Sequence, residues 1–191
     1  MLRRPKRKSQ LKGISLTTGV ERSAEDEAER IAQIMRVVRQ FNVPIGDAVC
    51  LIVNSHRILR DAGAPEIKCN VETVDKEISQ EGCRGPSLRE VRTALADAPQ
   101  LLGKNHAFTS ILIGLGESDQ RVIEGMDKLA LLGDISMLRA IVEHPLRAEE
   151  MQMRRPSTER LLYLAKMERR TPDKYGLRAD GAETMCALRT G

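Results

Sequence analysis

Apolar residues recur at helical spacing along most of the chain, and this periodicity constrains the fold more than any other feature. The first periodic segment runs from about Ser23 to Asn42, where Ser23 can cap a helix whose first turn is acidic. One apolar stripe follows: Ala28, Ile31, Ile34, Met35, Val38 and Phe41. Glycines and prolines fall between such segments, and no convincing period-two strand stands out. The pattern predicts an all-α fold, a multi-helix bundle of about seven to eight helices.

The composition agrees with a bundle. The chain has 191 residues, of which 41% are apolar, and this is enough for a substantial core. Only 2% are aromatic, so the core must be built from Leu, Ile, Val, Ala and Met. Such aliphatic cores favour helix-on-helix packing.

The other expected helices follow the same reasoning. A second helix is expected over about 45–62, where the run "AVCLIVN" is apolar nearly all round and would form the buried centre of an antiparallel hairpin. A short buried helix is expected within 100–117, where the glycines match neither phosphate-loop pattern, GxGxxG nor GxxxxGK[ST]. Ser118 and Asp134 would cap helices that end near residues 133 and 143, and a basic amphipathic helix is expected over 157–170.

The segment 71–98 has the outline of a helix-turn-helix. A short amphipathic helix ends at Gly82, a glycine-containing turn follows, and Ser87 with Glu90 forms a capping box for a second helix. In a DNA reader, Arg89 and Arg92 would meet guanine edges or phosphates, with Arg84 in the turn beside them. The alternative is an ordinary helical hairpin with a solvated charged face.

Basic residues are concentrated near the ends of the chain. Residues 1–12 carry six Lys or Arg and no acid, residues 147–174 are mildly basic, and the total formal charge is +4, so the middle is acidic. The basic N-terminal segment predicts contact with a polyanion, and the alternatives are a nuclear import signal or a solubilising tail. The predicted nucleic-acid-binding residues are Arg3, Arg4, Lys6, Arg7, Lys8, Lys12, Arg84, Arg89, Arg92, Arg154, Arg155, Arg160, Arg169 and Arg170.

Catalytic and metal-binding motifs are not evident in the sequence. The three histidines lie in no nucleophile motif, HExxH and GxSxG do not occur, and the four cysteines include no CxxC pair. The cysteine spacing favours reduced thiols over a disulfide framework. Catalytic residues, metal sites and cofactors are therefore not expected, and the chain is not expected to be an enzyme.

These observations predict a non-enzymatic polyanion-binding protein, a regulatory or packaging protein that binds nucleic acid. The alternative is a self-assembling structural protein, such as a viral matrix or capsid-like layer on an anionic membrane or genome. A homo-oligomer is expected in either case. The predicted organisation is a flexible basic arm over 1–20, helical modules over 21–98 and 99–171, and a flexible tail over 172–191. No membrane span or signal peptide is evident, so a soluble intracellular protein is expected, with the nucleus as one location.

Overall fold

The computed structural model describes residues 13–17, 19, 22–48, 53–82, 87–142 and 153–184. Within them lies a sheet of five parallel strands, so the prediction of an all-α bundle is wrong. The strands are β1 (Ile14–Thr17), β2 (Ile45–Ala48), β3 (Ile67–Lys68), β4 (Ala107–Ile113) and β5 (Asp134–Ala140). They lie in the sheet in the order in which they occur in the chain, and each is parallel to its neighbour.

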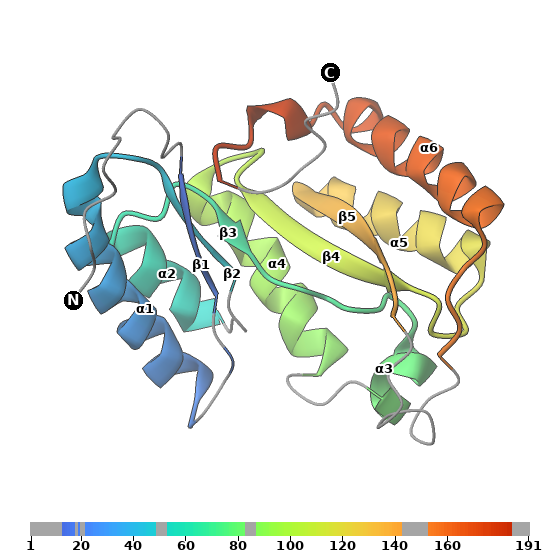
Figure 1. Cartoon of the computed structure of the whole chain (residues 1–191), viewed down its shortest axis with the longest axis horizontal. Coiled ribbons are helices and arrows are strands. Elements are labelled where there is room, and N and C mark those ends of the chain that lie inside the picture. Colours follow the sequence, from blue (N-terminus) through green and yellow to red (C-terminus); the bar gives the residue numbers. More distant parts are fainter. Residues whose placement is uncertain are drawn as a thin grey trace.

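Helices connect the successive strands, as a parallel sheet requires. They are α1 (Ala24–Val38), α2 (Val53–Asp61), α3 (Lys76–Gly82), α4 (Leu88–Leu102), α5 (Asp119–Leu132) and α6 (Thr158–Lys174). Short 3-10 turns occupy Arg39–Phe41 and Ala179–Gly181. In Figure 1, α4 and α5 lie behind the sheet, and α6 lies beside β5. The chain is therefore an α/β protein in which most helices cover one face of the sheet.

The two faces of the sheet contact different parts of the chain. On the helix-covered face, strand residues such as Ile67 and Ile111 pack with Met35 of α1 and Met126 of α5 in the larger hydrophobic core. The opposite face is here called the front face. There Phe108 and Met137 pack against Leu177 from the segment after α6. The carboxyl ends of the parallel strands share one edge of the sheet, here called the carboxyl edge.

Two expected helices are strands instead, and a third is in part a strand. The expected helix 45–62 is β2 followed, after residues 49–52 outside the described ranges, by α2. The expected buried helix within 100–117 is β4, and the one capped by Asp134 is β5. Parallel strands are covered on both faces, so β4 is an almost continuously buried run without a period of two. Such a run cannot be distinguished from a buried helix by its periodicity.

The predicted helix-turn-helix has a different role. Its second helix is α4, and the predicted capping box between Ser87 and Glu90 is confirmed. However, α4 is the crossover helix between β3 and β4, and its buried side, with Val91 and Leu95, belongs to the core beneath the sheet. The pair α3–α4 is therefore part of an α/β fold rather than a DNA-reading hairpin in a bundle.

Several predictions fall on residues outside the described ranges. They include seven predicted contact residues: Arg3, Arg4, Lys6, Arg7, Lys8, Lys12 and Arg84. The basic N-terminal segment and its predicted contacts with nucleic acid or a membrane therefore stay predictions. Across the ranges that the structure does describe, no helix has both the length and the apolar character that a membrane crossing demands.

Candidate functional site at the carboxyl edge

Polar side chains gather where β3 ends. From Ile67 to Thr73 buried and more open residues alternate strictly, which puts Ile67, Cys69, Val71 and Thr73 in the interior. The residues between them, Lys68, Asn70 and Glu72, are the more open ones. Since side chains of a strand alternate between its faces, the interior set belongs to the helix-covered side and Lys68 to the front face.

A bulge changes the direction of the chain at this point. The Cys69 amide donates to the Phe108 carbonyl at 2.9 Å, but the next ladder bond comes from Glu72, whose amide donates to the Ser110 carbonyl at 3.1 Å. Between them, the Val71 amide donates to Thr109 Oγ1 at 3.0 Å. Glu72 itself has a positive φ of 59°, an uncommon conformation for a residue other than glycine. Bulges and strained residues of this kind re-aim side chains and occur often beside functional sites.

The carboxyl of Glu72 lies with the other two polar side chains. Burial raises its pKa, while a hydrogen bond with the Asn70 side chain and the charge of Lys68 oppose this rise. Nearby on β4, Ser110 is buried, and its Oγ has no hydrogen-bond partner among the residues that the structure describes. The group therefore combines a carboxyl, an amide and an ammonium, and the Glu72 amide bonds it to the backbone of Ser110.

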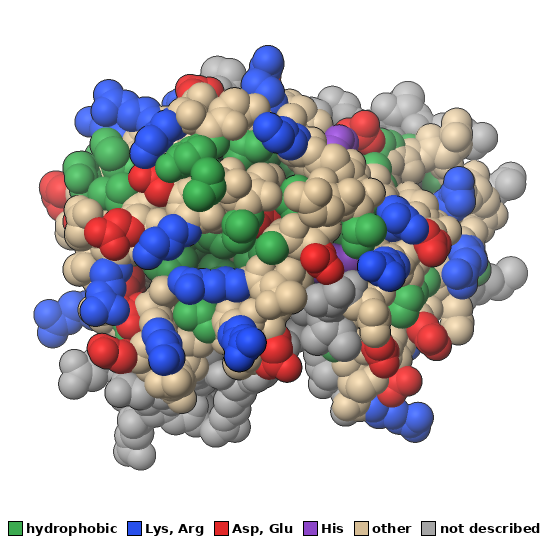
Figure 2. All heavy atoms as spheres, turned by 180° about the vertical axis from the view of Figure 1, so that it is seen from behind, with side chains coloured by type: hydrophobic (Ala, Val, Ile, Leu, Met, Phe, Trp, Pro, Cys, Tyr) green, Lys and Arg blue, Asp and Glu red, His purple; other side chains and the backbone are tan. Residues whose placement is uncertain are grey.

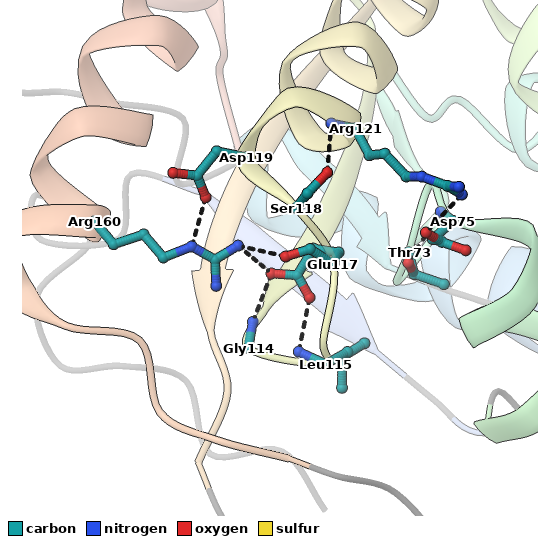
Figure 3. Close-up of polar contacts among 9 residues, drawn as sticks. All are labelled: Thr73, Asp75, Gly114, Leu115, Glu117, Ser118, Asp119, Arg121 and Arg160. Carbon is teal, nitrogen blue, oxygen red and sulfur yellow. Dashed lines mark hydrogen bonds and ion pairs between the residues drawn. The ribbon is translucent and has the colours of Figure 1, made fainter.

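A tight turn follows β4 at the same edge. The buried carboxylate of Glu117 accepts hydrogen bonds from the amides of Gly114 at 2.9 Å and Leu115 at 2.7 Å (Figure 3). Gly114 has a φ of +115°, and a Cβ there would overlap the backbone oxygen of Arg154. Only glycine fits this close approach. The turn is thus held by its own glutamate.

Arg160 connects the turn to α6. Its Nη2 lies 2.9 Å from Glu117 Oε1 and also donates to the Glu117 backbone oxygen, while its Nε donates to Asp119 at 2.6 Å (Figure 3). A second ion pair, between Arg121 and Asp75 at 2.9 Å, joins α5 to the start of α3, where Asp75 also accepts from the Glu77 amide. These contacts hold the loops of the carboxyl edge in one arrangement.

Of the predicted contact residues, the fold brings one set of three together. Arg154, Arg155 and Arg160 line one pocket at the end of β4. Arg89 and Arg92 line a different groove, of about 910 Å³, between α3 and α4. Arg169 and Arg170 are exposed farther along α6 and line neither cavity. In the view of the helical side, basic and acidic side chains are interspersed rather than gathered into a basic stripe (Figure 2).

Sequence reasoning missed the polar residues of the edge. Glu72 and Glu117 were not singled out, because the first falls in an expected helix and the second in an expected turn. A usable signal did exist for β3: apolar and polar residues alternate with a period of two from Ile67 to Glu72. For Glu117 the only local signal is the sequence "GLGES", whose role depends on Arg160, more than forty residues away.

Comparison with known proteins supports the fold. No family model and no curated protein matches the sequence. The solved structure of methylornithine synthase (PylB) matches with a TM-score of 0.64 at 18% identity, over 83% of this chain and 48% of that one. Coproporphyrinogen III oxidase (HemN) from Escherichia coli, described as a radical SAM enzyme, matches with a TM-score of 0.60 at 14% identity, over 82% and 39%. This chain therefore spans less than half the length of either protein.

A third structure is matched over nearly its full length. It is a domain of the pyruvate-formate lyase-activating enzyme from Bacteroides vulgatus, with a TM-score of 0.63 at 13% identity, over 87% of this chain and 96% of that one. At such identities the likeness concerns the fold alone. All three are enzymes or enzyme domains with the same α/β arrangement.

These findings correct the predicted function. The prediction of a non-enzymatic nucleic-acid-binding protein, and its alternative of a matrix-like structural protein, both rested on an all-α bundle that the structure does not contain. The three similar structures described above are enzymes or an enzyme domain. The expectation that the chain is not an enzyme is overturned on the same ground.

Proposed function

We propose that the carboxyl edge of the sheet is the small-molecule binding site of an enzyme, and that its ligand is the nucleoside compound S-adenosylmethionine. The observation that carries the proposal is the cluster of Lys68, Asn70 and Glu72 on the bulged end of β3, where the Glu72 amide donates to the Ser110 carbonyl of β4. In parallel α/β folds, ligands bind at the carboxyl ends of the strands, where loops can vary without disturbing the core.

The chemistry of the cluster suits a ribose. In nucleotide-binding α/β folds an acidic side chain commonly takes a hydrogen bond from a ribose hydroxyl. Glu72 can accept such bonds, and the Asn70 amide can donate and accept beside it. The identity of the nucleoside comes from the comparison, since HemN is described as a radical SAM enzyme.

The residues present do not fit an iron–sulfur cluster. Radical chemistry in enzymes relies on cofactors such as S-adenosylmethionine and iron–sulfur clusters, and a cluster is held by several cysteine thiolates at one place. Here no two cysteines lie within a few positions of each other, and Cys69 is buried in the hydrophobic core. Cys50, Cys83 and Cys186 lie outside the described ranges, and within those ranges no group of His, Cys, Asp or Glu could hold a metal ion.

The proposal for this chain is therefore binding and orientation rather than a radical step. Glu72 and Asn70 would hold the ribose, Lys68 would balance the charge of Glu72, and the braced turn at Glu117 would form one wall of the site. Because burial raises its pKa, Glu72 can also hold a proton at a higher pH than an exposed glutamate.

Calorimetric titration of the full chain with S-adenosylmethionine tests the proposal. We expect saturable binding, and Glu72→Gln should weaken it about tenfold, the cost of one charge-assisted hydrogen bond of about 1.4 kcal/mol. Glu77→Gln is the matched control, because it removes the same charge from an exposed position on α3. Circular dichroism should show that both variants keep the fold.

Two outcomes would reject the proposal. The first is an absence of saturable binding to the intact chain. The second is a Glu72→Gln variant that binds as tightly as Glu77→Gln, because the cluster would then have no part in binding. Titration with adenosine alone separates recognition of the nucleoside from recognition of the methionine part.

A further inference from the structure

A second pocket lies at the carboxyl end of β4. It has a volume of about 680 Å³ and is bounded by the turn at Gly114, Gly116 and Glu117, by the link 153–156 that leads into α6, and by Arg160. Three arginines line it, Arg154, Arg155 and Arg160, although all three are about forty residues from the turn that they face. Lys68, Asn70 and Glu72 are not among its lining residues.

Arg160 is held in position by ion pairs, but not all of its N–H donors take part in them. Its side chain is 24% exposed, and its Nε and Nη2 are bonded to Asp119 and Glu117. In Figure 3 its remaining nitrogen points away from both carboxylates. A guanidinium carries five N–H donors, so donors remain for a ligand after these bonds are made. The ion pairs also fix the side chain before a ligand arrives, and this lowers the entropic cost of binding.

The carboxylate of Glu117 is fully engaged within the protein. It accepts from two backbone amides of its own turn as well as from Arg160. The residue lines the pocket but is itself buried. Among the lining residues, Arg160 has carboxylate partners in Glu117 and Asp119, and Arg154 and Arg155 bring two further guanidinium groups to the same pocket.

The walls leave room for a small group. Gly116 has no side chain, and apart from its chain neighbours no described atom lies within 4 Å of its Cβ position. The Cβ position of Gly114, by contrast, is filled by the backbone of Arg154. The side chains of Arg154 and Arg155 are exposed, while Arg160 is partly covered. Planar guanidinium groups bind carboxylate and phosphate oxygens in pairs, better than any other side chain.

We propose that this pocket binds the carboxylate or phosphate group of a small acidic ligand, gripped by Arg154 and Arg155 against the fixed guanidinium of Arg160. The ligand is a small molecule rather than a polyanion, because the three arginines converge on one cavity instead of following an extended surface. This inference goes beyond the nucleoside site, since it needs neither Glu72 nor S-adenosylmethionine.

Titration of the isotope-labelled full chain, followed by NMR, tests the inference with two probes, inorganic phosphate and succinate. At constant ionic strength, at least one probe should cause saturable shifts of the amides of Gly114 and Gly116. The probe that binds more tightly identifies the oxyanion that the pocket prefers. The double variant Arg154→Ala/Arg155→Ala should weaken that binding at least tenfold.

Arg169→Ala/Arg170→Ala is the matched control, because it removes the same charge from exposed positions of α6 that do not line the pocket. It should bind the probe as the unaltered chain does. Arg160 is left intact in both variants because it holds the turn. Shifts that never saturate would overturn the inference, as would equal weakening in the two double variants, which would indicate general electrostatics only. A failure of S-adenosylmethionine binding would leave this result unaffected, so the two proposals can fail separately.

Discussion

Asp47 and Asp134 are buried on the sheet, and neither carboxyl has a hydrogen-bond partner among the described residues. Burial raises the pKa of each to about 8, and for Asp47 the nearby charge of Glu66 adds to the rise. His56 in α2 is also buried, and the part of the chain that the structure describes offers its ring nitrogens no hydrogen-bond partner. Burial lowers its pKa to about 4 against the opposing charge of Asp97. At neutral pH all three groups are therefore uncharged in the folded protein.

The two carboxyls should make the stability depend on pH. Their folded pKa of about 8 exceeds the usual 3.8, so the folded state holds protons that the unfolded state has released, and stability falls as the pH rises through this range. His56 acts in the opposite sense, but only below its usual pKa of 6.5. As the pH rises from 6.5 to 8, each carboxyl should therefore lower the free energy of unfolding by about 2 kcal/mol.

Urea unfolding of Asp47→Asn and Asp134→Asn across this interval checks the prediction. Each variant should lose less stability than the unaltered chain, and the double variant should lose the least, because an amide has no proton to release. Equal slopes for all four proteins would show that the carboxyls are already ionised in the folded state.

At the scale of the elements, helix starts were predicted well and strands poorly. Ser23, Ser87 and Ser118 cap α1, α4 and α5 as the sequence predicted, because a cap is a bond between residues three positions apart. Asp134 was predicted to cap a helix in the same way, but it begins β5 and its carboxyl is buried. A cap pattern is local, so it cannot show whether a neighbouring strand is available for pairing.

The turn after β4 gives a prediction at this scale. Gly114 and Gly116 both have a positive φ, but a Cβ on Gly114 would also lie 2.7 Å from Ile141 Cγ2 and overlap the Arg154 backbone, whereas nothing lies near Gly116. Gly116→Ala should therefore destabilise the protein by about 1 kcal/mol, from backbone conformation alone. Gly114→Ala should cost about 3 kcal/mol, because steric overlap is added. Chemical denaturation compares them, and equal losses would show that the turn adapts to a side chain.

At the scale of the whole molecule, the chain is a consecutive series of parallel strands with their connecting helices. The strand order equals the chain order, so each crossover places its helix beside the previous one. The carboxyl ends of all the strands therefore face the same side of the molecule, where the polar cluster of β3 and the arginine pocket of β4 both lie. The backbone arrangement alone therefore makes this side of the molecule the place where a site is expected.

The same scale provides a test of the cofactor chemistry. After anaerobic incubation with iron and sulfide, followed by desalting, the chain should retain far less iron than one cluster per molecule, because its cysteines are widely separated. Metal analysis and visible absorption measure this directly. Stoichiometric iron that is lost on replacing Cys50, Cys83 or Cys186 would contradict the expectation.

The sequence alone determined the positions of four helices, α1, α4, α5 and α6, since their apolar stripes and the caps at Ser23, Ser87 and Ser118 depend on neighbouring residues. It also predicted Arg154, Arg155 and Arg160, with Arg169 and Arg170, as basic contact residues of the segment around the last helix. Only the tertiary structure decided that the buried runs at β2, β4 and β5 are strands, because a strand is stabilised by hydrogen bonds to partners that lie far away in the chain. Two further features also depend on contact between segments that are distant in the chain: the bond between Glu117 and Arg160, and the pocket that the arginines line. A pattern of neighbouring residues cannot predict such a contact.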